Sequence, residues 1–598
     1  MSSASVAQAP RTGRIAYKWI ALSNTTLGIL MATINSSILM IALPDIFRGI
    51  KLDPLAPGNT PYFLWILMGF LLVTSVLVVS LGRIGDIYGR VRMFNIGFAV
   101  FTAFSALLSV TWMTGTHGAL WIVLMRLGQG VGGACVLANS SAIVTDAFPE
   151  NERGLALSIN GVAAISGSFI GLILGGLLAP VSWRLVFIVS VPLGLLGTLW
   201  SYLKLRDNGI RTPAKIDWIG NLLFAAGLVG VLLSIVYGLE PYGGHTMGWT
   251  KPFVLLCGFG GVAILAVFVL VERRVTDPMF RLHLFKSRTF TMGNITALLA
   301  GLSRGGLMFI LIIWLQGIWL PQHGYSFEKT PLWAGIYMVP LTVGFLISGP
   351  VSGRLTDRFG AKPFATAGMA LSATCFLLFD LMPMNFNYVW FGLLLLFMGL
   401  SLGLFFAPNI ASVMNSVPAD QRGAGAGMLN TFQNSAQVLS IGVFFTVITL
   451  GLASRLPQAL QHGLTAQGMP ANQAHTIANL PPIGTLFAAF LGYNPIKQLI
   501  GSPSAAHVSA AHYQFLTGRS FFPKLITGPF GHGLHLAFLM AAAVSLVGAI
   551  CSALRGSDTV EGRQGESARS AAEAVEAGVA GAGDAAMAEA GVGATIEA

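Results

Sequence analysis

One short pattern occurs twice in this chain, as Gly82-Arg83-Ile84-Gly85-Asp86-Ile87-Tyr88-Gly89-Arg90 and again as Gly353-Arg354-Leu355-Thr356-Asp357-Arg358-Phe359-Gly360-Ala361. Each copy stands at the end of a long apolar run, and the two copies occupy corresponding places. A match of this length at corresponding places indicates an internal repeat. The sequence therefore predicts two related halves built from apolar helices.

The composition is that of a membrane protein. Of 598 residues, 54% are hydrophobic and only 10% are charged, and the mean hydropathy is +0.73. A water-soluble globule would need more polar surface than this chain supplies. The net charge of +11 comes largely from Lys and Arg between apolar runs. That bias orients membrane proteins, so we expect a lipid bilayer and no nucleic acid among the partners.

Apolar segments of membrane length recur along the chain. A helix needs about 20 apolar residues, at 1.5 Å per residue, to cross a bilayer. Segments of that kind lie at about 19–43, 61–82, 95–113, 119–145, 156–180, 185–204, 217–238, 253–271, 291–318, 332–353, 364–383, 388–414, 425–452 and 534–554. The sequence therefore predicts an all-α polytopic membrane protein with fourteen transmembrane helices.

The loops between these segments predict the orientation. With a cytoplasmic N-terminus, four basic loops fall inside, whereas the short loops 114–118 and 384–387, which lack Lys and Arg, fall outside. The basic loops contain Arg83, Arg90 and Arg92; Lys204, Arg206, Arg211 and Lys215; Arg273, Arg274, Arg281, Lys286 and Arg288; and Arg354, Arg358 and Lys362. We expect a multi-pass protein of the cell (inner) membrane with both termini cytoplasmic.

The repeat and the helix count together predict the domain boundaries. Six helices precede and six follow an extra central pair. We expect a cytoplasmic tail, a six-helix half, the extra pair with its linkers, a second six-helix half with an extracytoplasmic insertion, and another cytoplasmic tail. These parts cover 1–18, 19–206, 207–290, 291–554 with the insertion 453–533, and 555–598.

The insertion contains an apolar stretch that is too short to cross a membrane. This stretch follows Leu480-Pro481-Pro482 and runs from Leu486 to Leu491. Its length predicts an element that lies at the membrane interface. The tail 555–598 is rich in Ala and Gly and mildly acidic, so disorder is the first expectation and a cytoplasmic helix the second.

The repeated pattern resembles the loop between the second and third helices of major facilitator superfamily transporters. The plan of twelve plus two helices resembles the fourteen-span drug:proton antiporter branch of that superfamily, over nearly the whole chain. Asp217-Trp218-Ile219-Gly220 before the extra pair, and Pro278 with Leu284-Phe285 after it, fit the same branch. The resemblance implies transport by alternating access.

The repeated loop is a candidate conformational latch. Its two glycines allow a tight turn, and its aspartate and arginine can form charge-assisted pairs at helix ends. The resemblance implies that the loop helps to hold the outward-facing state closed on the cytoplasmic side. The alternative is that the loop fixes only orientation and a short turn. The candidate latch residues are Gly82, Asp86, Gly89, Arg90, Asp357 and Arg358.

The fourth predicted helix carries Arg126-Leu127-Gly128-Gln129-Gly130-Val131-Gly132-Gly133, which resembles the family's fourth-helix motif. A charge in hydrocarbon costs roughly 2.5–3.5 kcal/mol by insertion scales, so it persists where a cavity, water or partner receives it. The resemblance implies a role in proton exchange for Arg126 and Gln129. The alternative is that Arg126 extends outward to the interface.

The first predicted helix departs from the branch's motif. Asn35-Ser36-Ser37-Ile38-Leu39-Met40-Ile41-Ala42-Leu43-Pro44 resembles that motif, but Asn35 stands where many members carry aspartate. An amide does not titrate, so Asn35 cannot carry a proton. In a proton-coupled transporter the carrier would be Asp45, Asp380 or an acid group of the substrate. The alternative for both aspartates is a solvated charge at the outer rim.

The fifth predicted helix contains Gly167-Ser168-Phe169-Ile170-Gly171-Leu172-Ile173-Leu174-Gly175-Gly176, which resembles the antiporter motif of exporters. Leu172 stands where that motif has proline, which weakens the argument for a kink. Glycines spaced by four give a smooth face for close helix contact. Packing alone is therefore the alternative to a role in antiport.

The ninth predicted helix places Arg304 near mid-depth, where a side chain reaches the interface with difficulty. Arg304 is a candidate for attracting a negative group into a cavity between the halves; the alternative is an interhelical ion pair or a clamp on backbone carbonyls. The candidate cavity residues are Asn35, Arg304, Gly171, Trp65 and Phe70. Lipid or core packing is the alternative for the two aromatic residues.

These features together predict a secondary transporter, not an enzyme. We expect a monomer that exports amphipathic small molecules, in the manner of multidrug efflux, coupled to proton entry. Two alternatives stay open: a uniporter, symporter or lipid exporter for anionic amphiphiles, and a membrane sensor that does not transport. The sequence has no GxxxxGK[ST] loop for ATP and no metal-site spacing among its four cysteines, so we expect no cofactor and no metal.

Overall fold

The chain folds into helices throughout the part that the computed structural model describes. That part is 16–556 without 54–55, 57, 208–216, 241, 244, 246, 276–277, 279, 419–420, 479, 492–493, 495, 497–499, 501–508 and 519–520. Its β pairing is limited to one isolated bridge, Tyr242 to His245. Fourteen helical segments in this part are long and apolar enough to cross a membrane. The predicted fold class is confirmed; the predicted tail 555–598 lies almost wholly outside the described residues.

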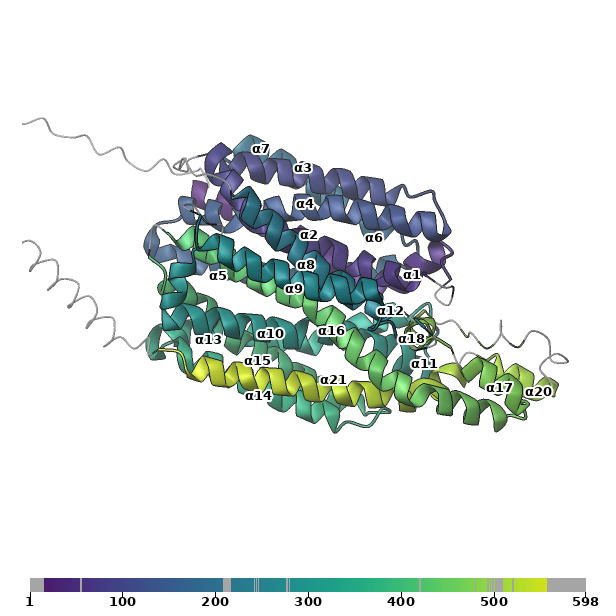
Figure 1. Cartoon of the computed structure of the whole chain (residues 1–598). Coiled ribbons are helices and arrows are strands. Elements are labelled where there is room, and N and C mark those ends of the chain that lie inside the picture. Colours follow the sequence, from purple (N-terminus) through teal and green to yellow (C-terminus); the bar gives the residue numbers. More distant parts are fainter. Residues whose placement is uncertain are drawn as a thin grey trace, which may run out of the picture.

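The N-terminal half contains six membrane segments (Figure 1). Two short helices, α6 and α7, follow each other closely and form the sixth segment. The helices of this half are α1 (Tyr17–Gly49), α2 (Thr60–Tyr88), α3 (Arg90–Ser109), α4 (Gly115–Ala147), α5 (Glu150–Leu178), α6 (Leu185–Ile188) and α7 (Ser190–Lys204).

The C-terminal half repeats this plan and adds an insertion. Its first membrane segment combines α10, a π-helical stretch η2 and α11, and its second combines α12 and α13. The elements are η1 (Leu282–Lys286), α10 (Arg288–Ile313), η2 (Trp314–Trp319), α11 (Leu320–Gln322), α12 (Thr330–Tyr337), α13 (Val339–Phe359), α14 (Ala361–Asp380), α15 (Tyr388–Asn415), α16 (Arg422–Thr465), α17 (Ala471–Ala478), α18 (Pro482–Phe490), α20 (Ala510–Leu516) and α21 (Phe521–Ala553).

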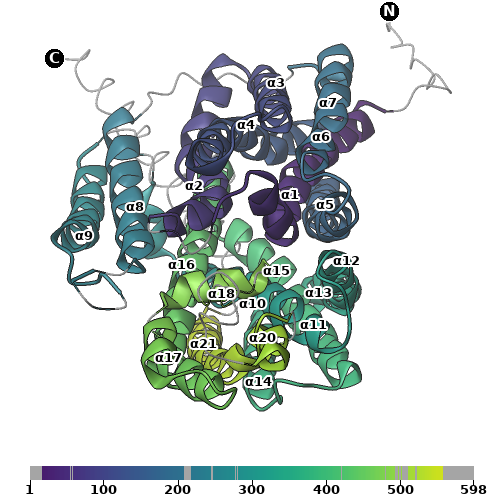
Figure 2. The same ribbon diagram turned by 90° about the vertical axis from the view of Figure 1, so that its right-hand side faces the viewer.

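The extra pair, α8 (Trp218–Gly238) and α9 (Pro252–Glu272), lies beside the seam between the two halves (Figure 2). Helix α8 contacts α2 of the first half and α16 of the second. On one side Ser80 Oγ donates a hydrogen bond to Asn221 Oδ1. On the other side, Gly442 of α16 lies so close to Ile235 of α8 that an added Cβ atom would be 2.7 Å from the Ile235 side chain. The pair therefore contacts both halves.

The repeated sequence pattern is also a repeated backbone conformation. Helix α2 ends and α3 begins around Gly89, which has φ of +110°. Helix α13 ends and α14 begins around Gly360, which has φ of +81°. Side chains with a Cβ atom rarely adopt such angles, so glycine lets both pairs of helices join through a single residue. The predicted relation between the halves is confirmed here.

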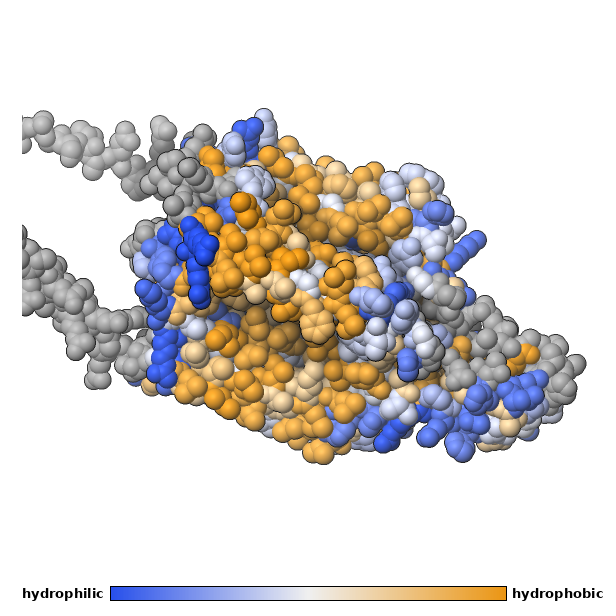
Figure 3. Space-filling model, viewed as in Figure 1, coloured by the Kyte–Doolittle hydropathy of each residue, from blue (hydrophilic) through white to orange (hydrophobic). Residues whose placement is uncertain are grey.

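The molecule has an apolar belt between two polar ends (Figure 3). Because the number of crossings is even, the start of α1 and the end of α21 lie at the same end, which we call the terminal face. The opposite end carries α17, α18 and α20, and we call it the insertion face. The short basic connections between helices lie at the terminal face.

The last two membrane helices are longer than predicted. Helix α16 continues past the predicted end at 452 to Thr465, and α21 begins at Phe521, so the predicted insertion 453–533 includes the ends of both helices and the segment 466–520 between them. Leu456, Leu460 and Leu464, spaced by four, are fully buried and continue the apolar face of α16. That spacing was readable in the sequence.

The short apolar stretch of the insertion is not at a lipid interface. It forms α18, where Leu486, Phe487 and Ala488 are at most 1% exposed. Their neighbours are aromatic side chains of other helices, as described below. The prediction of an interfacial element was therefore wrong, because length and hydrophobicity alone do not distinguish a lipid surface from a protein interior.

Candidate functional site

A buried arginine connects three helices inside the N-terminal half. Arg126 of α4 is 1% exposed, and its Nη1 donates hydrogen bonds to Asn35 Oδ1 of α1 and, over 2.6 Å, to Gln129 Oε1. Its guanidinium carbon lies 4.8 Å from the ring centre of Phe70 in α2. The structure thus brings together four of the predicted site residues. Arg126 points inward to them and does not extend to the interface.

Two serines extend this cluster to further helices. Gln129 Nε2 donates to Ser105 Oγ of α3 over 2.7 Å, and Asn35 Nδ2 donates to Ser190 Oγ of α7 over 3.3 Å. Both serines are fully buried. Sequence reasoning missed them because a hydroxyl in an apolar helix carries no charge or spacing signal. We call Asn35, Arg126, Gln129, Ser105 and Ser190 the polar network.

The polar network holds a positive charge without an acid. Among the described residues, Arg126 bonds only to amide oxygens and lies over the ring of Phe70, and its Nε is buried without a hydrogen-bond partner. Amide dipoles and an aromatic face compensate a buried cation less fully than a carboxylate does. An aspartate at position 35 would place a carboxylate against this guanidinium. Asn35 puts a neutral hydrogen bond there instead.

Two predicted cavity residues belong to helix packing. Phe70 is 2% exposed and meets Phe101 of α3 edge to face at 6.2 Å. A Cβ atom at Gly171 would lie 2.6 Å from Ile34 O of α1, so this glycine faces a neighbouring helix and not an open wall. Trp65 is partly buried and packs against the hydrophobic core. These contacts agree with the packing alternatives stated for Phe70 and for the glycines of α5.

The glycine-rich face of α5 serves close contact with α1. Gly167, Gly171 and Gly175 face Thr33, Ser37 and Ile41 in turn, one helical turn apart. Added Cβ atoms would overlap these neighbours, so the glycines permit the observed approach. This placement agrees with the packing alternative for the predicted antiporter motif.

Arg304 lies inside the C-terminal half with one aromatic contact. Its guanidinium carbon is 4.7 Å from the ring centre of Phe406 in α15. In the part of the chain that the structure describes, no carboxylate lies within ion-pair distance of Arg304, and its side chain is only partly buried. Neighbouring Gly305 faces Gln437 of α16. Arg304 therefore contacts α15, and the predicted alternative of an interhelical ion pair is not what the described residues form.

The two acids near the insertion face have basic partners. Asp45 Oδ1 of α1 lies 2.6 Å from Arg48 Nη2 of the next turn. Asp380 Oδ1 at the end of α14 lies 2.6 Å from His535 Nδ1 of α21. The side chains of these two acids are only 12% and 9% exposed. Both are thus held by specific partners and are not freely solvated.

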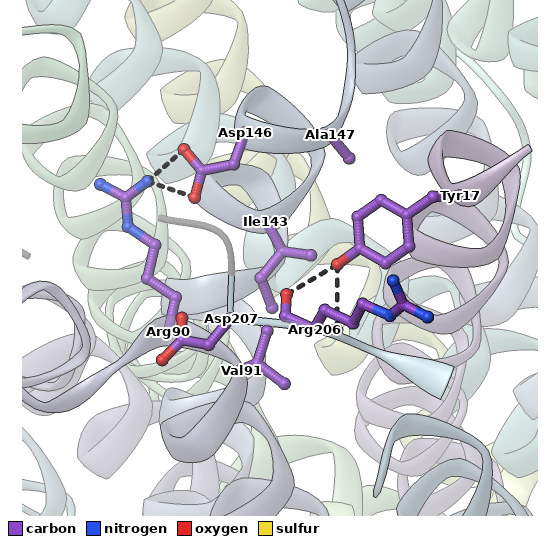
Figure 4. Close-up of a pocket in the computed structure, with 8 residues that line it drawn as sticks. All are labelled: Tyr17, Arg90, Val91, Ile143, Asp146, Ala147, Arg206 and Asp207. Atoms are coloured by element: carbon purple, nitrogen blue, oxygen red, sulfur yellow. Dashed lines mark hydrogen bonds and ion pairs between the residues drawn. The ribbon is translucent and has the colours of Figure 1, made fainter. Parts of the chain in front are cut away.

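The candidate latch is assembled at the terminal face (Figure 4). Arg90 Nε lies 2.8 Å from Asp86 Oδ1, and Arg90 Nη1 lies 2.6 Å from Asp146 Oδ1 at the end of α4. The arginine thus ties the end of α2 and the start of α3 to the end of α4. Sequence reasoning missed Asp146. An acid in the last turn of a helix is opposed by the helix dipole, and that was the available signal that a basic partner holds it.

A tyrosine closes the same corner of the molecule. Tyr17 Oη donates to Arg206 O over 2.7 Å and accepts from Arg206 N over 3.1 Å, beside a cavity of about 10 Å³ (Figure 4). That volume is about enough for one water molecule. The contact fixes the start of α1 to the segment after α7.

The second copy of the latch is described only in part. Arg358 is exposed, and its guanidinium carbon lies 5.5 Å from the ring centre of Phe359. The side chain of Asp357 lies outside the described residues. The ion pairs of the first copy therefore have no described counterpart here.

The comparisons with known proteins agree with this architecture. Residues 25–441 match the model of the Major Facilitator Superfamily. The chain belongs to this superfamily. It is accordingly a multi-pass membrane protein of a transporter family. A solved structure of a bacterial homologue of the human lysosomal transporter Spinster matches 92% of this chain and 100% of its own, with a TM-score of 0.53 and 14% sequence identity.

Two superfamily relatives have named substrates. The Tetracenomycin C resistance and export protein of Streptomyces glaucescens is 29% identical over 91% of this chain and 93% of its own length. The Riboflavin transporter RibZ of Clostridioides difficile (strain 630) is 27% identical over 77% of this chain and 94% of its own length. Both substrates belong to those proteins, and their difference shows that similarity at this level does not name a substrate.

Proposed function

We propose that this superfamily member exports amphipathic small molecules across the cell membrane by alternating access of its two halves. The relative that exports tetracenomycin C matches nearly the whole chain, which supports export. The basic connections at the terminal face support a cytoplasmic location for that face and for both termini. The ion pairs of Arg90 join α2, α3 and α4 at that face, and the latch proposal is that they weaken when the halves rearrange.

Arg304 is the observation that carries the proposal on substrate charge. Its side chain is partly buried inside the C-terminal half and has only an aromatic partner among the described residues. A negative group about 4 Å away would gain about 4 kcal/mol at an effective dielectric of 20, against about 1 kcal/mol in bulk water. Arg126 adds a second positive charge without an acid in the other half. The transported molecules are therefore anionic or neutral rather than cationic.

Coupling to proton entry is the finer part of the proposal. Arg126 and Gln129 order the polar network, but no member of that network titrates as an acid. The proton would be carried by Asp45, which sits beside Arg48 near the insertion face, or by an acid group of the substrate itself. Asp380, paired with His535, is the further candidate.

A second candidate is an exporter or uniporter of anionic amphiphiles, including lipids, that uses no proton. The neutral Asn35 next to Arg126 favours it, because an aspartate there would be the direct proton carrier. A membrane sensor without transport is the candidate from a different class. These three accounts predict different fluxes.

The decisive experiment measures flux in proteoliposomes that contain the purified chain. A fluorescent organic acid is offered with and without a proton gradient across the vesicle membrane. Proton-coupled export predicts accumulation that depends on the gradient and collapses with a protonophore. Equilibration without dependence on the gradient would support the second candidate. If a panel of amphiphiles shows no flux above that of protein-free vesicles, the result would support the membrane sensor.

A further inference from the structure

Helix α18 is a nine-residue helix enclosed by the membrane helices. It begins after Pro481, with prolines at its first turn, and its apolar residues from Leu486 to Phe490 are at most 2% exposed. A helix that is apolar on all sides belongs in an interior. The chain between α16 and α21 therefore returns from the insertion face into the molecule, where α18 packs against α16 and η2.

One side chain of α18 lies between the two halves. The ring of Phe487 stacks on Phe63 of α2 with a centre-to-centre distance of 4.1 Å. The same ring stacks on Phe445 of α16, with 5.4 Å between ring centres. Phe63 in turn packs on Phe47 of α1 at 4.1 Å. Phe487 is thus the middle member of an aromatic stack that runs from the N-terminal half into the C-terminal half.

The backbone of α18 packs against α16 and η2 of the C-terminal half. A Cβ atom at Gly317, in the π-helical stretch η2, would lie 3.3 Å from Phe490 Cα and 3.5 Å from Ala489 C. Phe490 also meets Phe309 of α10 at 5.9 Å between ring centres. Its stacking contact with the N-terminal half is the face of the Phe487 ring against Phe63.

Other contacts show that the halves meet at this end. Gln316 Nε2, in the same π-helical stretch, lies 3.5 Å from Ile41 O of α1. At the end of α5, a Cβ atom at Gly176 would lie 2.5 Å from Leu332 Cα of α12. The seam is therefore closed at the insertion face by backbone and amide contacts, and α18 fills the space next to them.

We propose that α18 is a plug that travels with the C-terminal half and closes the route to the insertion face. This inference rests on the proposed function, since alternating access requires the seam at that face to open. Opening separates the ring of Phe487 from that of Phe63. The contacts of Phe487 with Phe445 and of Phe490 with Gly317 remain. The apolar contact between Phe487 and Phe63 can close the seam reversibly. It excludes water when closed, and it breaks without separating any charges.

The first test measures access to Phe47, the fully buried residue at the far end of the aromatic stack, and needs no substrate. All four native cysteines are replaced, Phe47→Cys is introduced, and a membrane-impermeant thiol reagent is added from the insertion side. Phe487→Ala should speed labelling several-fold. The matched control is Phe490→Ala, which removes an aromatic ring of the same helix that packs on Phe309 of the C-terminal half. It should leave the labelling rate close to that of the parent. Equal rates in the two variants would overturn the plug.

The second test asks which half carries α18. A short bifunctional thiol reagent joins Phe63→Cys to Phe487→Cys across the seam, or Phe445→Cys to Phe487→Cys within the C-terminal half. The first link should stop flux in proteoliposomes, and the second should leave it. Full flux through the first link, or loss of flux with the second, would overturn the proposal. Because the labelling test is independent of transport, a wrong plug and a wrong proposed function give different results.

Discussion

Arg126 and Asn35 lie 91 residues apart in the chain, and their side chains are hydrogen-bonded in the interior of the N-terminal half. Both are buried, and the bond joins a full positive charge to a neutral amide. The Arg126 guanidinium thus stays buried without a carboxylate partner, and a buried charge without a counter-ion is costly. The relationship therefore concerns electrostatics as much as packing, and position 35 is the most direct place to change it.

Asn35→Asp should shift transport toward cations. The new carboxylate would face the Arg126 guanidinium and cancel its charge, which weakens the attraction for anionic substrates. The measurement is the ratio of cation flux to anion flux in proteoliposomes. Asn35→Ala is the control: it removes a hydrogen-bond acceptor from a buried charge and should cost about 1–3 kcal/mol of stability without reversing the ratio. An unchanged ratio in Asn35→Asp would contradict the electrostatic role.

Arg90→Gln should impair transport while the protein remains folded. It removes the ion pairs to both Asp86 and Asp146, which together stabilise one arrangement of the terminal face by about 1–2 kcal/mol. Such a change shifts a conformational equilibrium roughly 5- to 30-fold. Asp86→Asn should reproduce part of the loss. Arg92→Gln, an exposed arginine of the same loop, is the matched control and should transport normally at equal expression. If all three variants transported as well as the unmodified protein, the loop would act only as a signal for membrane orientation.

Gly89→Ala should lower the yield of folded protein. The position has φ of +110°, and an added Cβ atom would also meet the carboxylate of Asp207. Backbone strain of this kind costs on the order of 1–3 kcal/mol. Gly82→Ala, in the same motif, is the matched control, because its Cβ atom would lie 3.7 Å from Ala138 in ordinary contact. Thermal unfolding in detergent compares the two, and equal midpoints would disprove the conformational argument for Gly89.

The insertion face should be extracytoplasmic. Ala510→Cys, exposed on α20, should react with a membrane-impermeant thiol reagent in intact cells. Lys204→Cys, exposed at the terminal face, should react only after the cells are permeabilised. The native cysteines are replaced in both variants. The reverse pattern would invert the topology and the direction of transport with it.

The sequence predicted the helices well because a bilayer imposes a length and a composition on each of them. The glycines at 89 and 360 were also predictable, because the loop pattern repeats around them. The pairing of Arg126 with Asn35 was not, since residues of separate helices meet only through packing. Likewise, nothing in the composition of α18 says whether lipid or Phe63 covers Phe487. The polar groups could be identified from the sequence, but their hydrogen-bond partners depend on how the helices pack.

Arg304→Gln should weaken the transport of anions more than that of neutral molecules. The substitution removes the charge beside Phe406 and keeps a polar side chain of similar reach. Arg304→Lys is the matched variant: it keeps the charge and loses the planar group that lies on the ring, so anion transport should be largely retained. A structural role would instead lower the expression or stability of Arg304→Gln. The protein that still folds would keep the same preference for anions over neutral molecules.

The charge preference of the unmodified protein tests the central claim most directly. Proteoliposomes receive three probes of matched size and hydrophobicity: an anion, a neutral molecule and a cation. Protein-free vesicles correct for passive entry. We predict that the protein transports the anion and the neutral molecule and that the cation is transported poorly. Efficient transport of the cation with no transport of the matched anion would contradict the account and would make the protein an exporter of organic cations.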